Sequence, residues 1–581
     1  MARRSIMAIM FSGVLLLSAC GQSDTGEAAA APQAGPYMVA SANAHATEAG
    51  LEILAAGGSA VDAAIAVQAV LGLVEPQSSG LGGGAFLLHF DKSEGRLQTF
   101  DGRETAPASV TPDLFLNEDG EPLGFLDAVV GGRSVGVPGV VAMMGLAHEE
   151  HGRLPWADLF APALRLTEEG FEVSPRLNYL LGRLSRLETM PAARAYFYGA
   201  DGAPLPVGHV LKNPAYAETL RLLAEEGPAV FYEGVVAQQI VDAATTAPVA
   251  PSGMTVNDLK AYKPVERAPV CSEYRAVTLC GMGPPSSGGV TVLQILGILE
   301  NFDMGALQPN SAEALHLILE ASRLAYADRN LYLADSDFVE APVEELLNKD
   351  YLKSRAALID RSAAAEAVKA GDPTPFIVQK DARLPVKYAP DASPELPSTS
   401  HFSIIDANGD AVSMTTTVEF AFGSHVMAGG FILNNQLTDF SFLPERDGKP
   451  VANAVAPGKR PRSSMSPTIA FDENGDVWAA LGSPGGPAII GYVAKTLIAL
   501  IDWEMEMQAA IDLPNAVVPR GTPYLEKDKF SPQTIAALQA LGHDIKQREL
   551  TSGLHGVRIV DGALQGGADP RREGVAKAGG F

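Results

Sequence analysis

Hydrophobic positions recur at helical spacing over residues 45–73, in the stretches EAGLEILAAGG and SAVDAAIAVQAVLGL. The pair Gly57-Gly58 separates the two stretches, and paired glycines are typical of a helix end. Ser59 followed by Asp62 forms a capping-box pattern at the start of the second stretch. The pattern therefore predicts two consecutive helices. The second is covered by small apolar residues, so we expect it to pack closely against a sheet.

Apolar and polar residues alternate in two later segments of common design, HFSIIDANGDAVSMTTTV at 401–418 and PTIAFDENGDVWAALG at 467–482. Each places Asn-Gly between alternating runs, which is a strong hairpin signal. The second segment continues through GSPGG into the apolar helical stretch PAIIGYVAKTLIALIDW. Helices early and late, with strands between them, predict an α/β (α+β layered) fold in which sheets lie between helical layers.

The segment between these regions is predicted to be mostly helical over 135–365, after which the chain changes character. Residues 371–398 carry six prolines with little periodicity, which predicts an exposed connector. Within the helical region, His148-Glu149-Glu150-His151 is close to a zinc motif, but its histidines are three apart rather than four. We interpret this stretch as a solvated helix end and expect no metal site.

Composition supports a folded chain with a large core, since 47% of the 581 residues are hydrophobic and 7% are aromatic. The formal net charge of −25 argues against nucleic-acid partners, because binding to phosphates needs a basic surface. Any anionic substrate must then be bound by individually placed cations.

The first residues, MARRSIMAIMFSGVLLLSAC, combine two arginines, a short apolar run and a closing Leu-Ser-Ala-Cys. This pattern predicts an export signal rather than a membrane span. The closing four residues resemble a bacterial lipobox, which implies cleavage after residue 19 and lipidation of Cys20. Ordinary signal cleavage is the alternative. Residues 20–35 would form a flexible tether, and the product would be periplasmic, attached to the membrane only through its lipid.

Two further cysteines, Cys271 and Cys280, lie in CSEYRAVTLC, whose spacing suits a hairpin that turns within Glu273 to Ala276. Export to an oxidising compartment makes them candidates for a disulfide. Two free buried cysteines are the alternative.

Hydroxyl residues gather at one end of the first predicted hairpin. If Ala407 to Gly409 form a three-residue loop, the register places Thr399 opposite Thr417; a two-residue loop would place Val418 there instead. A threonine hydroxyl is a poor nucleophile without a base, and a chain-terminal threonine can use its own α-amine. Such an amine would exist only after cleavage of the bond that precedes Thr399.

Acyl transfer also needs hydrogen-bond donors for the developing oxyanion. Gly485 and Gly486, at a predicted helix start, could supply backbone amides. The alternative is that these glycines only permit a tight turn.

Several longer motifs resemble those of the γ-glutamyltranspeptidase family, within the N-terminal-nucleophile hydrolases. They are DGRETAP (101–107), GMGPPSSGG (281–289), TSHFS (399–403), ILNNQLTDFS (432–441), RPRSSMSPT (460–468), GSPGG (482–486) and DPRREG (569–574). The resemblance implies a four-layer αββα fold and self-cleavage between Ser398 and Thr399. The products would be a large subunit, 36–398, that ends in the connector 370–398, and a small catalytic subunit, 399–581, held together as a heterodimer.

The resemblance also implies a role for individual residues. Thr399 would be the nucleophile, Thr417 its supporting hydroxyl, and Gly485 and Gly486 the oxyanion hole. Side chains that bind the α-carboxylate and α-amino groups of a γ-glutamyl substrate would be Arg103, Ser463 and Ser464, and Gln436 and Asp439, respectively. Glu419 stands where many members have Asn, and it can still accept a bond from an ammonium.

A γ-glutamyltransferase or glutathione hydrolase is the implied activity, with transfer to water or to an amino-acid or peptide acceptor and no cofactor. The segment between Asp439 and Ser463 looks shorter than in members with a lid and contains no tyrosine, so we expect a more open pocket. Alternatives are a glutaryl- or cephalosporin-type acylase and a catalytically inactive binding lipoprotein.

Overall fold

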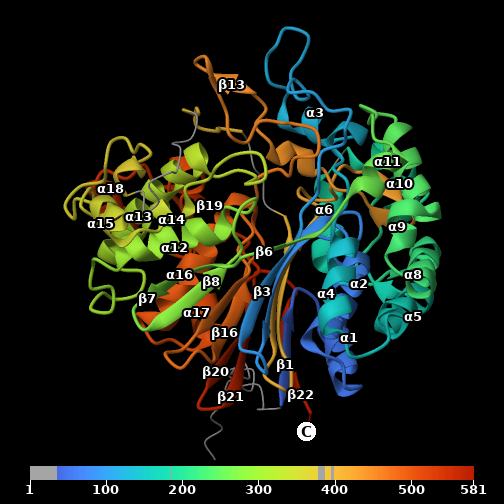
Figure 1. The fold of residues 1–581 in the computed structure, drawn as a ribbon, viewed down its shortest axis with the longest axis horizontal. Helices are drawn as coiled ribbons and strands as arrows, with labels where there is room; N and C mark the ends of the chain where they lie inside the picture. Colours follow the sequence, from blue (N-terminus) through green and yellow to red (C-terminus); the bar gives the residue numbers. More distant parts are fainter. Residues whose placement is uncertain (1–35, 185, 377–386, 394–397, 581) are drawn as a thin grey trace, which may run out of the picture.

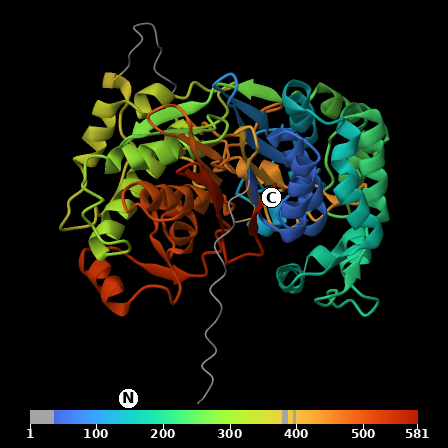
Figure 2. The ribbon, with the colours of Figure 1, turned by 90° about the horizontal axis from the view of Figure 1, so that it is seen from below.

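The computed structural model describes residues 36–184, 186–376, 387–393 and 398–580. Two β-sheets pack face to face in the centre, and helices cover the outer face of each (Figure 1). Viewed from below, the helices of the first hundred residues and those of residues 288–356 lie on opposite sides of the sheets (Figure 2). The predicted layering of helices around sheets is confirmed. The predicted signal, tether and Cys20 lie outside the described residues.

The first sheet mixes strands from both ends of the chain, and all its neighbouring strands are antiparallel. Its order is β22 (Val575–Gly579), β1 (Tyr37–Ser41), β9 (Ser400–Ile405), β10 (Ala411–Thr417), β2 (Gly84–Asp91), β3 (Arg96–Gly102) and β6 (Val265–Arg267). β9 and β10, which follow residue 398, thus lie between β1 and β2, which precede it, so hydrogen bonds join the two predicted subunits across the sheet.

The second sheet is also antiparallel and also draws on both parts of the chain. Its order is β21 (Ala563–Ala568), β20 (His555–Val560), β16 (Val477–Gly482), β15 (Thr468–Phe471), β8 (Val277–Gly281) and β7 (Val270–Tyr274). Cys271 and Cys280 lie opposite each other in β7 and β8 and form a disulfide. Of the two alternatives left open by the sequence, the structure thus has the bridged pair.

Both Asn-Gly hairpins form where the alternating pattern predicts them. In the first, the backbone N–H of Asp406 donates to the carbonyl of Asp410 at 2.9 Å, which closes a three-residue loop. Ser400 then pairs with Thr416, so the next step of the register brings Thr399 beside Thr417. In the second, β15 and β16 flank the turn at Asn474-Gly475.

Helices α1 (Ala44–Ala55), α2 (Ala60–Val74) and α4 (Val140–His151) cover the first sheet, and α12 (Gly288–Leu299), α13 (Ala312–Tyr332) and α16 (Ile489–Ile501) lie on the side of the second (Figure 1). Every residue of α2 is buried, and the predicted capping box between Ser59 and Asp62 is present. Small side chains let α2 approach β9 and β10 closely, which gives the strands that carry the site a rigid support.

The other helices are α3 (Phe125–Val129), α5 (Ala161–Glu169), α6 (Pro175–Arg183), α7 (Pro191–Phe197), α8 (Pro214–Glu226), α9 (Ala229–Glu233), α10 (Val235–Thr245), α11 (Val256–Ala261), α14 (Val343–Leu346), α15 (Lys349–Ala356), α17 (Met507–Asp512) and α18 (Pro532–Ala540). Short strand pairs also occur at β4 (Phe171–Glu172) with β5 (Val210–Leu211), β11 (Met427–Ala428) with β12 (Phe431–Ile432), and β13 (Glu445–Arg446) with β14 (Lys449–Pro450), and a small sheet joins β17 (Ala516–Val517), β18 (Tyr524–Glu526) and β19 (Lys546–Arg548). In the described part of the chain, no helix combines the length and the apolar character needed to cross a bilayer.

Two local predictions were only partly right. As expected of a solvated helix end, α4 ends at His151, and Glu149 and Glu150 are exposed. The imidazoles of His148 and His151 are only partly exposed, however, and their Nε2 atoms contact the carbonyl of Leu154 at 2.9 Å and the side chain of Gln98 at 2.7 Å. The connector is not uniformly exposed either. Asp391 is buried, because its carboxylate pairs with Arg462 at 2.9 Å. Periodicity showed none of these contacts, and those of His151 with Gln98 and of Asp391 with Arg462 join residues distant in sequence.

Candidate active site

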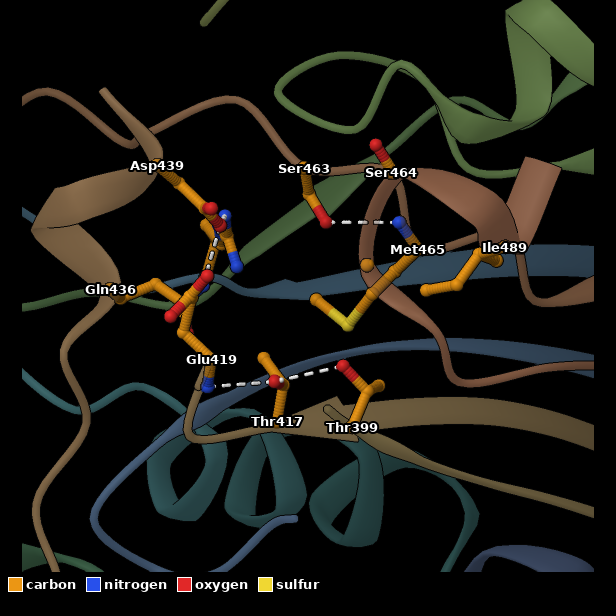
Figure 3. A pocket seen from close by; sticks show the side chains of 11 residues that line it. Thr399, Thr417, Glu419, Gln436, Asp439, Ser463, Ser464, Met465 and Ile489 are labelled. Carbon is orange, nitrogen blue, oxygen red and sulfur yellow. Dashed lines mark hydrogen bonds and ion pairs between the residues drawn. The ribbon is translucent and has the colours of Figure 1, made fainter. Parts of the chain in front are cut away.

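The two threonine hydroxyls predicted to face each other do so at the end of the first hairpin. Thr399 lies just before β9 and Thr417 ends β10, and their Oγ1 atoms are 3.0 Å apart (Figure 3). The Thr417 Oγ1 also accepts a hydrogen bond of 2.8 Å from the backbone N–H of Glu419. Both threonines are buried. The three-residue loop therefore creates the juxtaposition, because a shorter loop would turn Thr417 to the other face of the sheet.

Ser398, which contributes the carbonyl of the peptide bond before Thr399, is held by two hydrogen bonds. The carbonyl oxygen of Ser398 accepts a hydrogen bond of 3.0 Å from the backbone N–H of Gly485, and the Ser398 hydroxyl donates to the carbonyl of Gln77 at 2.9 Å. Thr399 has φ of +96°, a strained conformation for a β-branched residue. The backbone at Thr399 is thus strained, and the Ser398 carbonyl faces an amide donor where an oxyanion would form.

The turn that presents this amide links β16 to α16. Gly485 has φ of +137°, and a Cβ atom there would lie 2.6 Å from the ring of Tyr492. Glycine is therefore required both for the backbone conformation and for the packing. Gly486 begins the short 3-10 turn that leads into α16.

A pocket of about 310 Å³ opens next to the two threonines. None of residues 440–462 is among the residues that line it, and the more open pocket expected from the short segment there stays a prediction. The lining residues are Arg103, Thr399, Thr417, Glu419, Gln436, Asp439, Ser463, Ser464, Met465, Gly486 and Ile489 (Figure 3).

Arg103 provides the cationic side of the pocket. Its guanidinium donates to the carbonyls of Pro461 and Arg462 at 3.0 and 2.9 Å and to Asp439 at 2.5 Å. Burial raises the pKa of the adjacent Glu104 to about 8, although Arg103 lies 3.7 Å away and opposes this rise. Glu104 is therefore mostly neutral at pH 7, so it does not cancel the charge of Arg103.

Ser463 and Ser464 line the same pocket. They directly follow Pro461 and Arg462, whose carbonyls accept hydrogen bonds from Arg103. The backbone N–H of Met465 donates to the Ser463 hydroxyl at 3.0 Å, and Arg329 donates to the Ser464 hydroxyl at 2.6 Å. These bonds orient the hydroxyl groups. A serine that accepts a bond retains a hydrogen of its own to donate. Hydroxyls beside a guanidinium suit a planar carboxylate.

Acceptors gather on the other side of the pocket. Gln436 donates to the Asp439 carboxylate at 2.7 Å, and the amide of Asn435 donates to Glu419 at 2.5 Å. Glu419 occupies a left-handed conformation, with φ of +78°, that turns the chain sharply after β10. Two carboxylates close to the bound position of a substrate favour an ammonium group there.

Sequence reasoning did not identify several residues of the site. Met465 and Ile489 line the pocket, and Arg329 orients Ser464 from α13. Arg572 donates to the Thr399 carbonyl at 2.8 Å. Arg572 falls within the quoted motif DPRREG, but no sequence pattern indicates which backbone it reaches. Among the described residues, no group of three or more His, Cys, Asp or Glu side chains is placed to hold a metal ion.

Comparison with known proteins identifies relatives along almost the whole chain. Residues 46–579 match the sequence model of the family described as Gamma-glutamyltranspeptidase. The glutathione hydrolase proenzyme of Escherichia coli (strain K12) is 38% identical over 551 residues, which cover 92% of this chain and 90% of that protein. The acylase ACY 1 proenzyme of Pseudomonas sp. (strain V22) is 35% identical over 559 residues, or 94% of each chain.

Solved structures share the same architecture. The cephalosporin acylase from Bacillus halodurans superposes with a TM-score of 0.82 at 26% identity, covering 97% of this chain and all of that one. The match therefore includes both sheets and both helical layers, and the fold is the four-layer αββα fold of the N-terminal-nucleophile hydrolases. From the extent of the family match and the identity to its relatives, the chain belongs to the gamma-glutamyltranspeptidase family.

Proposed function

We propose that this protein is a γ-glutamyltransferase and glutathione hydrolase that cleaves itself between Ser398 and Thr399 and then uses Thr399 as its nucleophile. The observation that carries the proposal is the arrangement at the bond before Thr399. Thr399 has a strained backbone conformation, and its hydroxyl contacts the hydroxyl of Thr417. The carbonyl of the preceding residue, Ser398, accepts a hydrogen bond from the Gly485 amide. The name of the E. coli relative supports the choice of substrate.

Maturation would proceed as an acyl shift within the chain. The Thr399 Oγ1 attacks the carbonyl carbon of Ser398, and the Gly485 N–H stabilises the oxyanion. The C–N bond then breaks, so that the Ser398 acyl group is esterified to Thr399 and the nitrogen of Thr399 becomes an amine that takes up the hydroxyl proton. Water hydrolyses the ester, which leaves Ser398 as a carboxyl terminus and Thr399 as an amino terminus.

Turnover would use the same atoms a second time. The α-amine of Thr399 accepts the proton of its own hydroxyl, and Oγ1 attacks the γ-carbonyl of the substrate while Gly485 and Gly486 hold the oxyanion. The proton passes to the departing amine as the amide C–N bond breaks. Water or an acceptor amine then attacks the γ-glutamyl ester and releases Thr399. Every group that takes part in these reaction steps belongs to the protein, the substrate, the acceptor or water.

The pocket would bind the two charged ends of the γ-glutamyl group separately. Arg103, Ser463 and Ser464 would hold the α-carboxylate, and Asp439, Gln436 and Glu419 the α-ammonium. Since Asp439 also bonds Arg103 at 2.5 Å, the two subsites are adjacent and suit a single α-amino acid. With its α-carboxylate held at Arg103 and its α-ammonium held at Asp439, the substrate would have its γ-carbonyl next to Thr399.

An acylase is the second candidate, because acylases are among the relatives by sequence and by structure. A glutaryl group has no amino group, however, so it would not form the charge-assisted hydrogen bonds that Asp439, Gln436 and Glu419 can accept from an ammonium. Turnover of γ-glutamyl-4-nitroanilide and glutaryl-4-nitroanilide by the purified protein separates the two. We expect the γ-glutamyl compound to give the higher kcat/KM; an equal or higher value for the glutaryl compound would make the protein an acylase.

The two subunits would remain together after cleavage because both contribute strands to each of the two sheets and these strands are hydrogen-bonded to one another. For location, we propose export to the periplasm and attachment through a lipid on Cys20, which the signal-like start of the sequence supports. Fractionation tests the anchor: wild-type protein should sediment with membranes and the Cys20→Ser variant should not. Equal release of both would leave an unanchored exported enzyme.

A further inference from the structure

Arg572 contacts the backbone of the proposed nucleophile and does not line the pocket. It lies between β21 and β22, and its Nη1 donates to the Thr399 carbonyl at 2.8 Å while Nη2 donates to Thr551 at 3.4 Å. Burial and the neighbouring Arg176 lower the pKa of Arg572 to about 9, so the guanidinium is cationic at neutral pH. The Arg572 guanidinium therefore lies near the Thr399 nitrogen, which cleavage converts to an α-amine.

Bond lengths within Thr399 set an upper limit on the distance between the Arg572 guanidinium and the future α-amine. In any residue the carbonyl oxygen lies at most about 3.6 Å from its own nitrogen, by standard bond lengths. Adding this to the observed 2.8 Å places Nη1 within about 6.4 Å of the Thr399 nitrogen. A like charge about 4–6 Å away disfavours the protonated form of an amine.

Other charges around Arg572 only partly offset it. Burial raises the pKa of Glu75 to about 7, so this carboxyl is only about half ionised at neutral pH. The Asp569 carboxylate pairs with Arg571 at 3.0 Å, and Glu573 accepts from the backbone N–H of Arg176. Further charged or titratable groups face the region from other elements: Tyr492 on α16, His555 on β20, and Arg103, Glu419 and Asp439 across the pocket.

A free α-amine ordinarily has a pKa of about 7.7–8.0, so most of it is protonated at neutral pH and cannot accept a proton. We propose that Arg572 is a positioning residue that holds the Thr399 carbonyl and keeps the α-amine of the processed enzyme in its neutral, proton-accepting form. The inference rests on the proposed function, because the amine exists only after cleavage. It assigns to Arg572 an electrostatic effect on the α-amine, in addition to its packing in the fold.

The pH dependence of kcat/KM tests this role, since its acid limb reports the base of the free enzyme. With γ-glutamyl-4-nitroanilide as substrate, the limb of R572M should move to higher pH by about one unit, because the ammonium is no longer destabilised. R572K keeps the charge, and its limb should stay within about 0.3 unit of wild type. A purely structural Arg572 would lower the activity of R572M at every pH without moving the limb, and that result would overturn the proposal.

Arg176 offers a matched control, because its guanidinium belongs to the same cluster but faces Glu75 at 4.0 Å. R176M should move the limb less than R572M does. An equal shift in R176M, or a shift in R572K as large as in R572M, would show that no specific contact of Arg572 is involved and would also overturn the proposal.

If R572M fails to mature, E75Q decides the matter instead. This variant keeps Arg572 and removes the carboxylate that offsets it, so the acid limb should fall by about half a unit. An unchanged or raised limb in E75Q would contradict the proposal. Failure of the proposed function looks different: wild-type protein would then remain a single chain or would not hydrolyse the γ-glutamyl anilide at all.

Discussion

Replacing Thr417 by valine removes one hydroxyl and keeps the size and β-branching of the side chain. The wild-type hydroxyl lies 3.0 Å from the Thr399 Oγ1 and accepts the Glu419 N–H at 2.8 Å, and only 2% of the residue is exposed. In T417V the Thr399 hydroxyl loses its partner and a buried backbone N–H loses this acceptor. Water does not readily replace either bond at so buried a site.

Loss of one such buried hydrogen bond costs about 1–3 kcal/mol, which corresponds to a rate lower by about 5- to 150-fold. We expect self-cleavage of T417V to slow by a factor in this range, as followed on denaturing gels from freshly purified precursor. T417S restores the hydroxyl and should mature within about threefold of the wild-type rate. Cleavage of T417V at the wild-type rate would refute the role of this hydroxyl.

Three further predictions concern binding and stability. D439N should lower kcat/KM for γ-glutamyl-4-nitroanilide by about 30-fold, since a charge-assisted bond to the ammonium contributes about 2 kcal/mol, and should affect the glutaryl compound less; an equal loss for both would place Asp439 outside the amino-group subsite. Replacing Cys271 and Cys280 together by serine should lower the unfolding free energy by about 2–3 kcal/mol in the chain-entropy model, as measured by denaturant titration, because the disulfide closes a loop with a sequence separation of only 9; an unchanged midpoint would contradict this. Arg571 and nearby hydrogen-bond donors lower the pKa of Asp569 to about 2 against the burial that raises it. Its stabilisation, about 2 kcal/mol, is therefore present above pH 4 and lost as the pH falls toward 2. In D569N the unfolding free energy should fall less steeply between pH 4 and 2, and an unchanged slope would argue against the shift.

Local patterns predicted the elements that carry the site, but not every register. Asn408-Gly409 and the alternation around it predicted the hairpin and left a loop of two or three residues open. The family resemblance favoured the three-residue loop, and the structure has this loop, with Thr399 beside Thr417. Ser59 and Asp62 likewise identified the start of α2. These predictions succeeded because hydrogen bonding between residues close in sequence determines turns and caps.

Contacts between distant segments could not be predicted in this way. Asp391 was assigned to an exposed connector, but it is buried by Arg462, more than seventy positions later in the chain. Arg329 belongs to an amphipathic helix whose pattern does not show which polar residue turns toward the pocket. Arg572 reaches Thr399 only because β22 returns to the edge of the first sheet beside β1. Each of these contacts depends on how layers assemble, which periodicity does not encode.

Motif resemblance supplied what local patterns lacked for the pocket itself. The residues assigned to the two ends of a γ-glutamyl group come from three separate motifs and from Glu419, and the structure places all of them around one pocket. Residue types alone would not have grouped Arg103 with Ser463, since each is more often a surface residue when considered singly. Their shared place next to Thr399 supports the proposed roles, which remain to be tested.

Identification of the chain ends of the purified protein tests the central claim most directly. Intact mass measured under denaturing conditions, before and after incubation, should show the precursor replaced by two fragments, the smaller beginning at Thr399 and the larger ending at Ser398. A chain that stays intact on long incubation, or one that is cut at a different bond, would contradict the account of Thr399 as a self-generated N-terminal nucleophile.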